Sequence, residues 1–281
     1  PTTNGLTILK NGTDAVTTGI LFGGSTTNLT IATTATLATT DFLKISYVAA
    51  TGNWGDAAGN QVADSQWFMG GSGSNTINIH SLNGNVTVPL AATVYGNAGD
   101  EIIIGSNTTA IAGQANPFGD VIFGGIGNDT ITGGAGADTL SGGLGGADNF
   151  IFNRDDAVAI VGGDRGDFRF TALGPNGVDA LVERIVDFDT LDTITLTGNL
   201  IPAVDFDNVD GLITANTFAF VRGDNVRDAF FRVDNAGVDI MLFYDNIDAV
   251  GVQLAAVLLD GAGGMNFNVA TLNGVNTITI V

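Results

Sequence analysis

The 281-residue chain has no cysteine and a single histidine, His80. This excludes disulfides, zinc fingers, iron–sulfur ligation, cysteine nucleophiles and the HExxH metalloprotease site from the sequence. A Ser-His-Asp triad would have to use His80, which lies in the alternating run Thr-Ile-Asn-Ile-His-Ser-Leu and is interpreted as structural. The sequence also lacks a Gly-X-Ser-X-Gly elbow. We therefore predict no catalytic residues and expect a protein that is not an enzyme.

Basic residues are scarce, with nine Lys and Arg against 29 acids and a formal net charge of -20. Such a charge repels phosphate backbones and anionic membrane surfaces, so we predict no binding to nucleic acid. Glutamate is rarer still, because only Glu101 and Glu183 are Glu and the other acids are Asp. Aspartate suits turns and short-range oxygen ligation, so the expected partner of this charge is a hard cation such as Ca²⁺.

Long hydrophobic runs are also missing. No window reaches the apolar length of a membrane span, so none is predicted. The first residues, Pro-Thr-Thr-Asn-Gly, have neither the basic nor the apolar region of a secretory leader. Three interpretations stay open: a leader was removed, the chain is a fragment, or export does not use a cleaved N-terminal signal.

Glycine is abundant, with 41 residues, and 44% of the chain is hydrophobic. Dense turns combined with this much apolar surface predict a folded, all-β chain rather than a helical bundle or a disordered segment. Residues 27–33 and 42–48 alternate as half-buried strands do. We expect a hairpin around Asp234-Asn-Ala-Gly, and one short helix over residues 252–259.

An internal repeat of nine residues is the most informative feature. Residues 124–132 read Gly-Gly-Ile-Gly-Asn-Asp-Thr-Ile-Thr, and residues 133–141 follow without a gap as Gly-Gly-Ala-Gly-Ala-Asp-Thr-Leu-Ser. A near copy with one extra residue begins at Gly142. The repeat decays upstream, where Asp120, Asp100 and Asn75 keep its frame in weaker copies.

The repeat predicts a metal-binding coil. A six-residue turn and a three-residue strand form a half-coil, so two copies make one 18-residue coil of a parallel β-roll. Copies two apart then stack, which pairs Asp120 with Asp138 on one edge and Asp129 with Asp148 on the other. Each pair would share a calcium ion with backbone carbonyl oxygens, because unscreened stacked carboxylates repel. We therefore expect the roll to fold only when calcium binds.

The candidate ligands comprise the repeat aspartates, the glycines that permit positive φ in the turns, and a separate downstream acidic group. They are Asp100, Asp120, Gly125, Gly127, Asp129, Gly134, Gly136, Asp138, Gly143, Gly145, Asp148, Asp187, Asp189 and Asp192. Charge divides accordingly, with -3 over residues 1–100 and -17 over residues 101–281. We expect three domains: a Thr- and Asn-rich β region (1–90), the calcium-binding β-roll (91–152), and an acidic β-rich domain resembling a β-sandwich or β-solenoid (153–281).

These repeats resemble the Gly-Gly-X-Gly-X-Asp-X-U-X nonapeptides of the RTX family. Residues 147–152 look like the aromatic strand that closes RTX rolls. Residues 183–196 are similar to the acidic segment that follows such rolls in proteins exported by type I secretion. The resemblance implies a Ca²⁺ cofactor, an uncleaved C-terminal secretion signal, and a location outside the cell or on the surface of a Gram-negative-type bacterium.

RTX repeats occur in proteases, lipases, cytolysins, adhesins and surface-layer proteins, so they do not by themselves assign a function. Our first hypothesis is a noncatalytic structural protein that forms a homo-oligomer or polymer, as a surface-layer or filament subunit. The second is an adhesin or carbohydrate-binding module that binds a cell-surface polysaccharide through Trp54, Trp67 and Tyr47. The third is the export half of a secreted hydrolase.

Overall fold

The computed structural model describes most of the chain. The described residues are 6–12, 14–15, 18–21, 30–33, 37–47, 65–80, 91–106, 119–153, 167–169, 183–198, 200–202, 217–227, 230–233, 236–245, 254–272 and 275–281. Strands dominate these segments, which confirms the predicted all-β fold. No helix within them is both long and apolar enough to cross a membrane.

The strands before the nonapeptides are β1 (Leu6–Lys10), β2 (Asp14–Ala15), β3 (Thr18–Leu21), β4 (Thr30–Thr33), β5 (Leu43–Tyr47), β6 (Ser65–Met69), β7 (Thr76–Asn78), β8 (Ala92–Ala98) and β9 (Ile102–Ile104). Those at and just after the nonapeptides are β10 (Val121–Ile126), β11 (Thr130–Thr132), β12 (Thr139–Gly143), β13 (Asn149–Phe152), β14 (Asp167–Arg169), β15 (Glu183–Ile185) and β16 (Thr193–Leu196). The remaining elements are β17 (Ile201–Pro202), β18 (Thr217–Arg227), β19 (Phe230–Val233), β20 (Asp239–Asp245), β21 (Leu254–Leu259), the 3-10 turn η1 (Ala262–Gly264), β22 (Phe267–Leu272) and β23 (Val275–Ile280).

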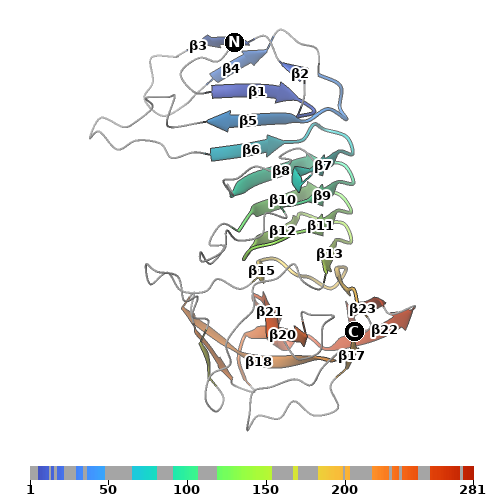
Figure 1. The fold of residues 1–281 in the computed structure, drawn as a ribbon. Coiled ribbons are helices and arrows are strands. Elements are labelled where there is room, and N and C mark those ends of the chain that lie inside the picture. The colour runs from blue at the N-terminus through green and yellow to red at the C-terminus, as the bar shows by residue number, and fades with distance from the viewer. Residues whose placement is uncertain are drawn as a thin grey trace.

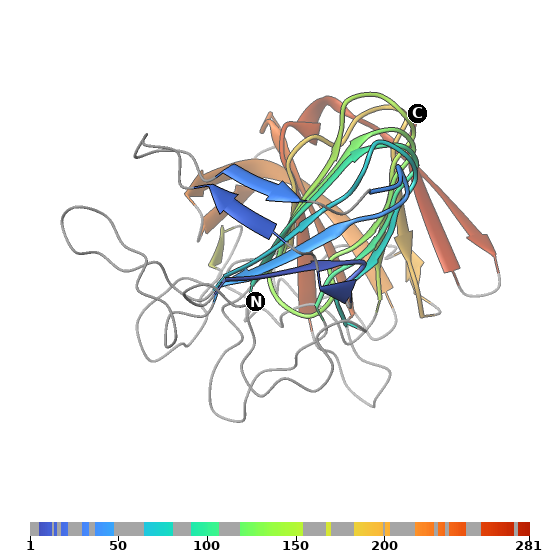
Figure 2. The same ribbon diagram turned by 90° about the horizontal axis from the view of Figure 1, so that it is seen from above.

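The centre of the molecule is a parallel β-roll. One face contains β6, β8, β10, β12 and β15, and the other contains β7, β9, β11, β13 and β16, each set paired in parallel. Successive coils therefore stack one above the next (Figure 1), and the view from above shows them nearly superimposed (Figure 2). The predicted parallel β-roll is confirmed.

Period-two alternation within each short strand explains the core. Alternate strand residues point inward, so stacking produces two columns of fully buried apolar side chains. The apolar column of the first face consists of Phe68, Val94, Ile122, Leu140, Ile185 and Leu259. The apolar column of the second face consists of Ile77, Ile103, Ile131, Phe150, Ile194 and Ile278. This core is thin, because each strand of the roll contributes only one or two buried apolar residues.

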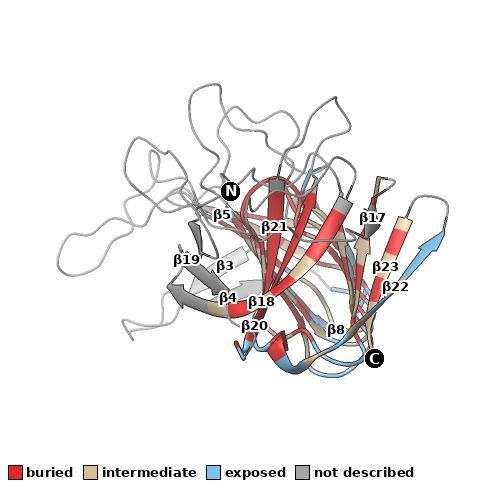
Figure 3. Cartoon of the chain, turned by 90° about the horizontal axis from the view of Figure 1, so that it is seen from below, coloured by how far each residue is buried: buried red, intermediate tan, exposed pale blue. Residues whose placement is uncertain are grey.

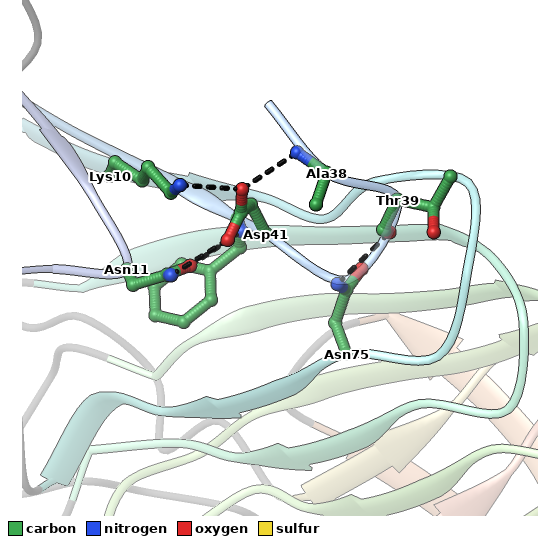
Figure 4. Close-up of polar contacts among 7 residues, drawn as sticks. Lys10, Asn11, Ala38, Thr39, Asp41 and Asn75 are labelled. Carbon is green, nitrogen blue, oxygen red and sulfur yellow. Dashed lines mark hydrogen bonds and ion pairs between the residues drawn. The ribbon is translucent and has the colours of Figure 1, made fainter. Parts of the chain in front are cut away.

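An antiparallel strand continues one face of the roll at each end. At one end β5 pairs antiparallel with β6, and at the other β23 pairs antiparallel with β16. The turn before β5 is fixed by Asp41, whose carboxylate contacts Lys10 Nζ at 2.8 Å, Asn11 Nδ2 at 2.9 Å and the Ala38 backbone N–H at 2.7 Å (Figure 4). These bonds lower the pKa of Asp41 to about 2, led by the contact with Lys10. Asp41 is thus a structural acid rather than a ligand.

The predicted division into three domains stays a prediction. Backbone pairing crosses both expected boundaries, since β6 pairs with β8 across the first and β13 pairs with β16 across the second. The coils also extend on both sides of residues 91–152, from β6 to β16. The roll and its flanking regions therefore share two continuous sheets.

Two local predictions were wrong. Residues 252–259 were expected to form a helix, but β21 lies between β15 and β20 in a sheet, with Ala255 to Leu259 all buried. A continuous apolar run is typical of a strand buried on both faces, and its periodicity does not distinguish it from a buried helix. The hairpin expected around Asp234 was also wrong, because β19 and β20 each pair with β18 rather than with each other.

Candidate metal centre

Seven acidic side chains line up in two columns beside the turns of the roll. The strand register places Glu101, Asp129, Asp148 and Asp192 one above the other, and we call this column the first ladder. It places Asp120, Asp138 and Glu183 in a second ladder on the opposite edge. All seven are buried, with at most 4% of their surface exposed. The expected stacking of Asp120 on Asp138 and of Asp129 on Asp148 is therefore present.

Backbone hydrogen bonds hold the first ladder in register. The N–H of Glu101 donates to Asp129 Oδ1 at 2.8 Å, and the N–H of Asp129 donates to Asp148 Oδ1 at 2.8 Å. The N–H of Asp148 donates in turn to Asp192 Oδ1 at 3.0 Å. Each of the three aspartate carboxylates thus uses one oxygen to bind the preceding coil, which fixes its position.

The second ladder repeats this pattern. The N–H of Asp120 donates to Asp138 Oδ1 at 2.6 Å, and the N–H of Asp138 donates to Glu183 Oε2 at 3.3 Å. Asp120 Oδ1 accepts from the backbone N–H of Ala92 at 2.7 Å, above the ladder. The same geometry therefore recurs on both edges of the coil.

Some carboxylate oxygens of the first ladder have no donor. Asp129 Oδ2 and both carboxylate oxygens of Glu101 are buried without a hydrogen-bond partner. In the described part of the chain, no basic side chain forms an ion pair with Glu101 or Asp129. A buried carboxylate without a partner costs several kcal/mol, roughly, so this arrangement requires a cation or a proton.

Burial raises the pKa of these acids. It raises the pKa of Glu101 to about 7, with the neighbouring Asp129 carboxylate adding to the effect. Burial likewise raises the pKa of Asp148 to about 7 and that of Asp192 to about 6, with further contributions from adjacent acids. The pKa values of Asp120 and Asp129 are raised by burial as well. The metal-free ladders therefore favour protonated acids, and a divalent cation would take the place of those protons.

The first glycine of each repeat leaves room beside a carboxylate. A Cβ atom on Gly124 would overlap Asp129 Oδ2, one on Gly133 would overlap Asp138 Oδ2, and one on Gly142 would overlap Asp148 Oδ2. These glycines do not have positive φ, so close approach rather than backbone conformation explains them.

The second and fourth glycines are explained by backbone conformation. Gly125 has φ 123° and Gly127 has φ 145°, in the region that favours glycine. The other four predicted turn glycines, Gly134, Gly136, Gly143 and Gly145, also have positive φ. A Cβ on Gly125 would overlap the Asn97 carbonyl oxygen, and one on Gly143 would overlap that of Gly125. Carbonyl oxygens of one turn thus lie directly against the next turn.

The donor set fits calcium. Ca²⁺ takes six to eight oxygen ligands, roughly, and accepts carboxylates together with backbone carbonyls. Each step of a ladder brings a carboxylate next to the close-packed carbonyls of stacked turns. No group of three acids converges on one point in the described residues, so backbone oxygens must supply the remaining ligands. The ladder acids would hold the ion, which would supply the positive charge that these buried carboxylates lack.

The structure differs from the predicted ligand set at Asp100. Glu101 rather than Asp100 occupies the aspartate position of its copy, because β9 pairs with β11 so that Ile102 lies opposite Thr130. Asp100 is exposed, and its Oδ1 accepts from the backbone N–H and the Nδ2 of Asn128. Asp100 therefore joins neighbouring turns from outside the ladder.

The downstream acidic group divides in the same way. Asp192 joins the first ladder, below Asp148. Asp187 instead accepts from the Ser141 hydroxyl and from the backbone N–H groups of Gly142 and Gly143 at 3.0 and 2.9 Å. Asp189 is exposed and accepts from the Leu191 N–H at 2.8 Å. The structure thus gives Asp187 and Asp189 turn-stabilising bonds.

Sequence reasoning missed Glu101, Glu183 and the first glycines as site residues. The two glutamates of the chain both occupy aspartate positions, one at the first coil of its ladder and one at the last. Each glutamate directly precedes the strand residues of its half-coil, Ile102-Ile103 or Arg184-Ile185, as the aspartates of the repeat do. This position in the sequence was the signal that could have identified them. The first glycines could have been found because glycine begins each copy of the repeat, at Gly124, Gly133 and Gly142.

An amide ends the first ladder above Glu101. Asn75 occupies the aspartate position of the preceding coil, because Thr76 pairs with Ile102. Its Oδ1 accepts from the Gly71 N–H at 2.7 Å and its Nδ2 donates to the Thr39 carbonyl at 3.5 Å (Figure 4). A neutral side chain satisfied on both atoms needs no cation, so the charged column stops here.

The raised pKa values predict how pH affects the metal-free protein. Glu101 and Asp148 have pKa values of about 7 when folded, against about 4 when unfolded, so they stabilise the fold below about pH 4 and this contribution is lost as pH rises through about 7. We expect the melting temperature in calcium-free, resin-treated buffer to fall between about pH 5 and about pH 8. Saturating calcium should flatten this dependence. A melting temperature that rises with pH in the metal-free protein would contradict the assignment.

The comparison with protein families agrees with this geometry. The model of the RTX calcium-binding nonapeptide repeat (4 copies) matches residues 114–147. A search of curated proteins gave no match. Among solved structures, the AlgE6R3 subunit of the Azotobacter vinelandii mannuronan C5-epimerase matches with 20% identity over 69% of this chain and 70% of that one, at a TM-score of 0.22, too low to support an argument. Residues 114–147 are therefore RTX calcium-binding nonapeptide repeats, typical of secreted proteins, and the cofactor of this chain is Ca²⁺.

Proposed function

We propose that this protein is a secreted, noncatalytic structural protein that assembles outside the cell, as a surface-layer or filament subunit of a Gram-negative-type bacterium. The observation that carries the proposal is the position of the acid ladders within continuous sheets. The ladders extend from Glu101 to Asp192, and the sheets that contain them continue into β5 on one side and β21 and β23 on the other. Calcium bound along the ladders would therefore order the whole body rather than one module.

Calcium-dependent folding supports export before assembly. Extracellular modules bind calcium with dissociation constants of about 10⁻⁴ to 10⁻³ M, far above cytosolic levels. A chain whose buried acids need calcium stays unfolded inside the cell and folds on reaching the outside. This order of events suits type I secretion, and it delays assembly until the subunit is outside.

Electron microscopy of the purified full chain tests the proposal. We expect ordered arrays or filaments in calcium at about 5 mM, which is above the dissociation constants of extracellular modules, and dispersed, expanded chains after calcium is removed with EGTA. Monomers under both conditions would contradict assembly. Sedimentation velocity on the same samples would show whether small oligomers form below the detection limit of the images.

A second candidate is a carbohydrate-binding module. Of the predicted stacking residues, Trp54 and the side chain of Tyr47 lie outside the described residues, and Trp67 is half-buried. A different pair favours this candidate: the rings of Tyr95 and Phe123 stack at 5.2 Å and 8°, and Tyr95 is 40% exposed. Glycan-array binding by a monomer in calcium would favour this function, whereas assembly without glycan binding would favour the first.

A further inference from the structure

The hairpin formed by β22 and β23 contains no charged side chain. Residues 261–281 contain no Asp, Glu, Lys, Arg or His, in a chain whose formal net charge is -20. The hairpin forms one border of its sheet, where β23 pairs with β16 and β22 pairs with β23. A second copy can approach such a neutral segment with less repulsion than it would meet at the acidic parts of the molecule.

The strand β22 presents an open edge. In the described residues its pairing is with β23, and no strand lies on its other side. Most of it is exposed, including Ala270 and Leu272, and Figure 3 shows it at the outside of the molecule. Proteins usually protect such edges with charges, proline or bulges. The sequence Phe-Asn-Val-Ala-Thr-Leu has no charge and no proline, and its pairing with β23 shows no register shift.

The hydrogen-bond pattern shows which backbone groups face outward. The N–H of Val281 donates to the Asn266 carbonyl at 2.9 Å, so this opposed pair is hydrogen-bonded. Hydrogen-bonded and non-hydrogen-bonded pairs alternate in an antiparallel ladder. The register of Phe267 opposite Ile280 then directs the backbone N–H and C=O groups of Phe267, Val269 and Thr271 toward the open edge.

We propose that β22 pairs antiparallel with β22 of a second copy of this chain, with Val269 opposite its own symmetry mate. This register uses all three outward-facing residues, because Phe267 of each copy then lies opposite Thr271 of the other. Such pairing is isologous and closes into a dimer that joins two sheets into one. The inference rests on the proposed function, for which it names a surface of self-assembly.

Substitutions at Ala270 test the pairing. In the proposed register Ala270 lies opposite Asn268 of the other copy and diagonal to the second Ala270, about 7–8 Å away. Both Ala270→Lys and Ala270→Glu should weaken self-association in calcium by about fivefold, because like charges then meet across the new ladder. An equimolar mixture of the two variants should recover the association of the unmodified chain. Sedimentation velocity over a concentration series measures all of these samples.

The controls separate the possible results. A general charge effect on a protein of net charge -20 would shift the two variants in opposite directions, whereas edge pairing weakens both. Val238→Lys adds the same charge at a side chain that is 63% exposed elsewhere, and it should leave association unchanged. If the unmodified chain associates and the Ala270 variants associate equally well, the edge inference is wrong and the proposed assembly stands. If the unmodified chain stays monomeric, the proposed assembly itself is wrong.

Discussion

Removing calcium at about pH 8 is expected to abolish most of the β-sheet signal of the full chain, and adding calcium back should restore it. Above the raised pKa values of about 7, the buried acids of the first ladder ionise without a compensating charge. Burying one unpaired carboxylate costs several kcal/mol, roughly, whereas a whole domain is stable by about 5–15 kcal/mol. Two or three such charges therefore exceed the stability that a thin core provides. Far-UV circular dichroism during a calcium titration measures the effect.

Magnesium provides the matched control for this experiment. Mg²⁺ carries the same charge, but it requires near-octahedral geometry at about 2.0–2.1 Å and gives up its waters reluctantly. Backbone bonds from the neighbouring coil hold the carboxylates of Asp129 and Asp148, so the first ladder cannot contract around a smaller ion. With magnesium at the same concentration, the chain should keep the circular dichroism spectrum of an unfolded protein. A spectrum and melting temperature that stay the same after calcium removal would contradict the role given to the ladders.

The nonapeptide period predicted the core of the roll correctly. A repeat of nine gives two half-coils per turn, and the structure stacks Ile122 on Leu140 and Ile131 on Phe150 as that period requires. The extra residue of the third copy is absorbed in the turn, since Asp129 and Asp148 still align. Local periodicity sufficed here because the turn and the strand are both short and copies two apart pair directly.

The same reasoning failed where insertions separate the coils. Strands β8 and β10 pair although 28 residues separate their partners Val94 and Ile122, so no fixed period links Glu101 to Asp129. Glu183 joins the second ladder after an even longer insertion. Position in the strand frame, rather than spacing from the last repeat, determines which acid enters a ladder. For the same reason β21 was not recognisable as a partner of β15 from its own sequence.

Substitution of Gly124 by alanine is expected to raise the calcium concentration at the folding midpoint by about tenfold. The added Cβ would overlap Asp129 Oδ2, a buried oxygen that has no hydrogen-bond partner in the structure. Either the carboxylate moves away from the position its backbone bond to Glu101 sets, or the turn shifts. Overpacking of this kind costs about 1–3 kcal/mol, and about 1.4 kcal/mol already corresponds to a tenfold change. Calcium titrations followed by circular dichroism give the midpoint directly.

Gly264→Ala is the matched control, because a Cβ there would meet no atom within 4 Å and the residue lies in η1, away from the ladders. Its calcium midpoint should equal that of the unmodified chain. Gly125→Ala makes a useful third variant, since its φ of 123° strains alanine through the backbone and its added Cβ would overlap the Asn97 carbonyl oxygen rather than a carboxylate. It should lower the melting temperature at saturating calcium as well as raise the midpoint. Equal midpoints for Gly124→Ala and Gly264→Ala would show that the space beside Asp129 is not needed for calcium.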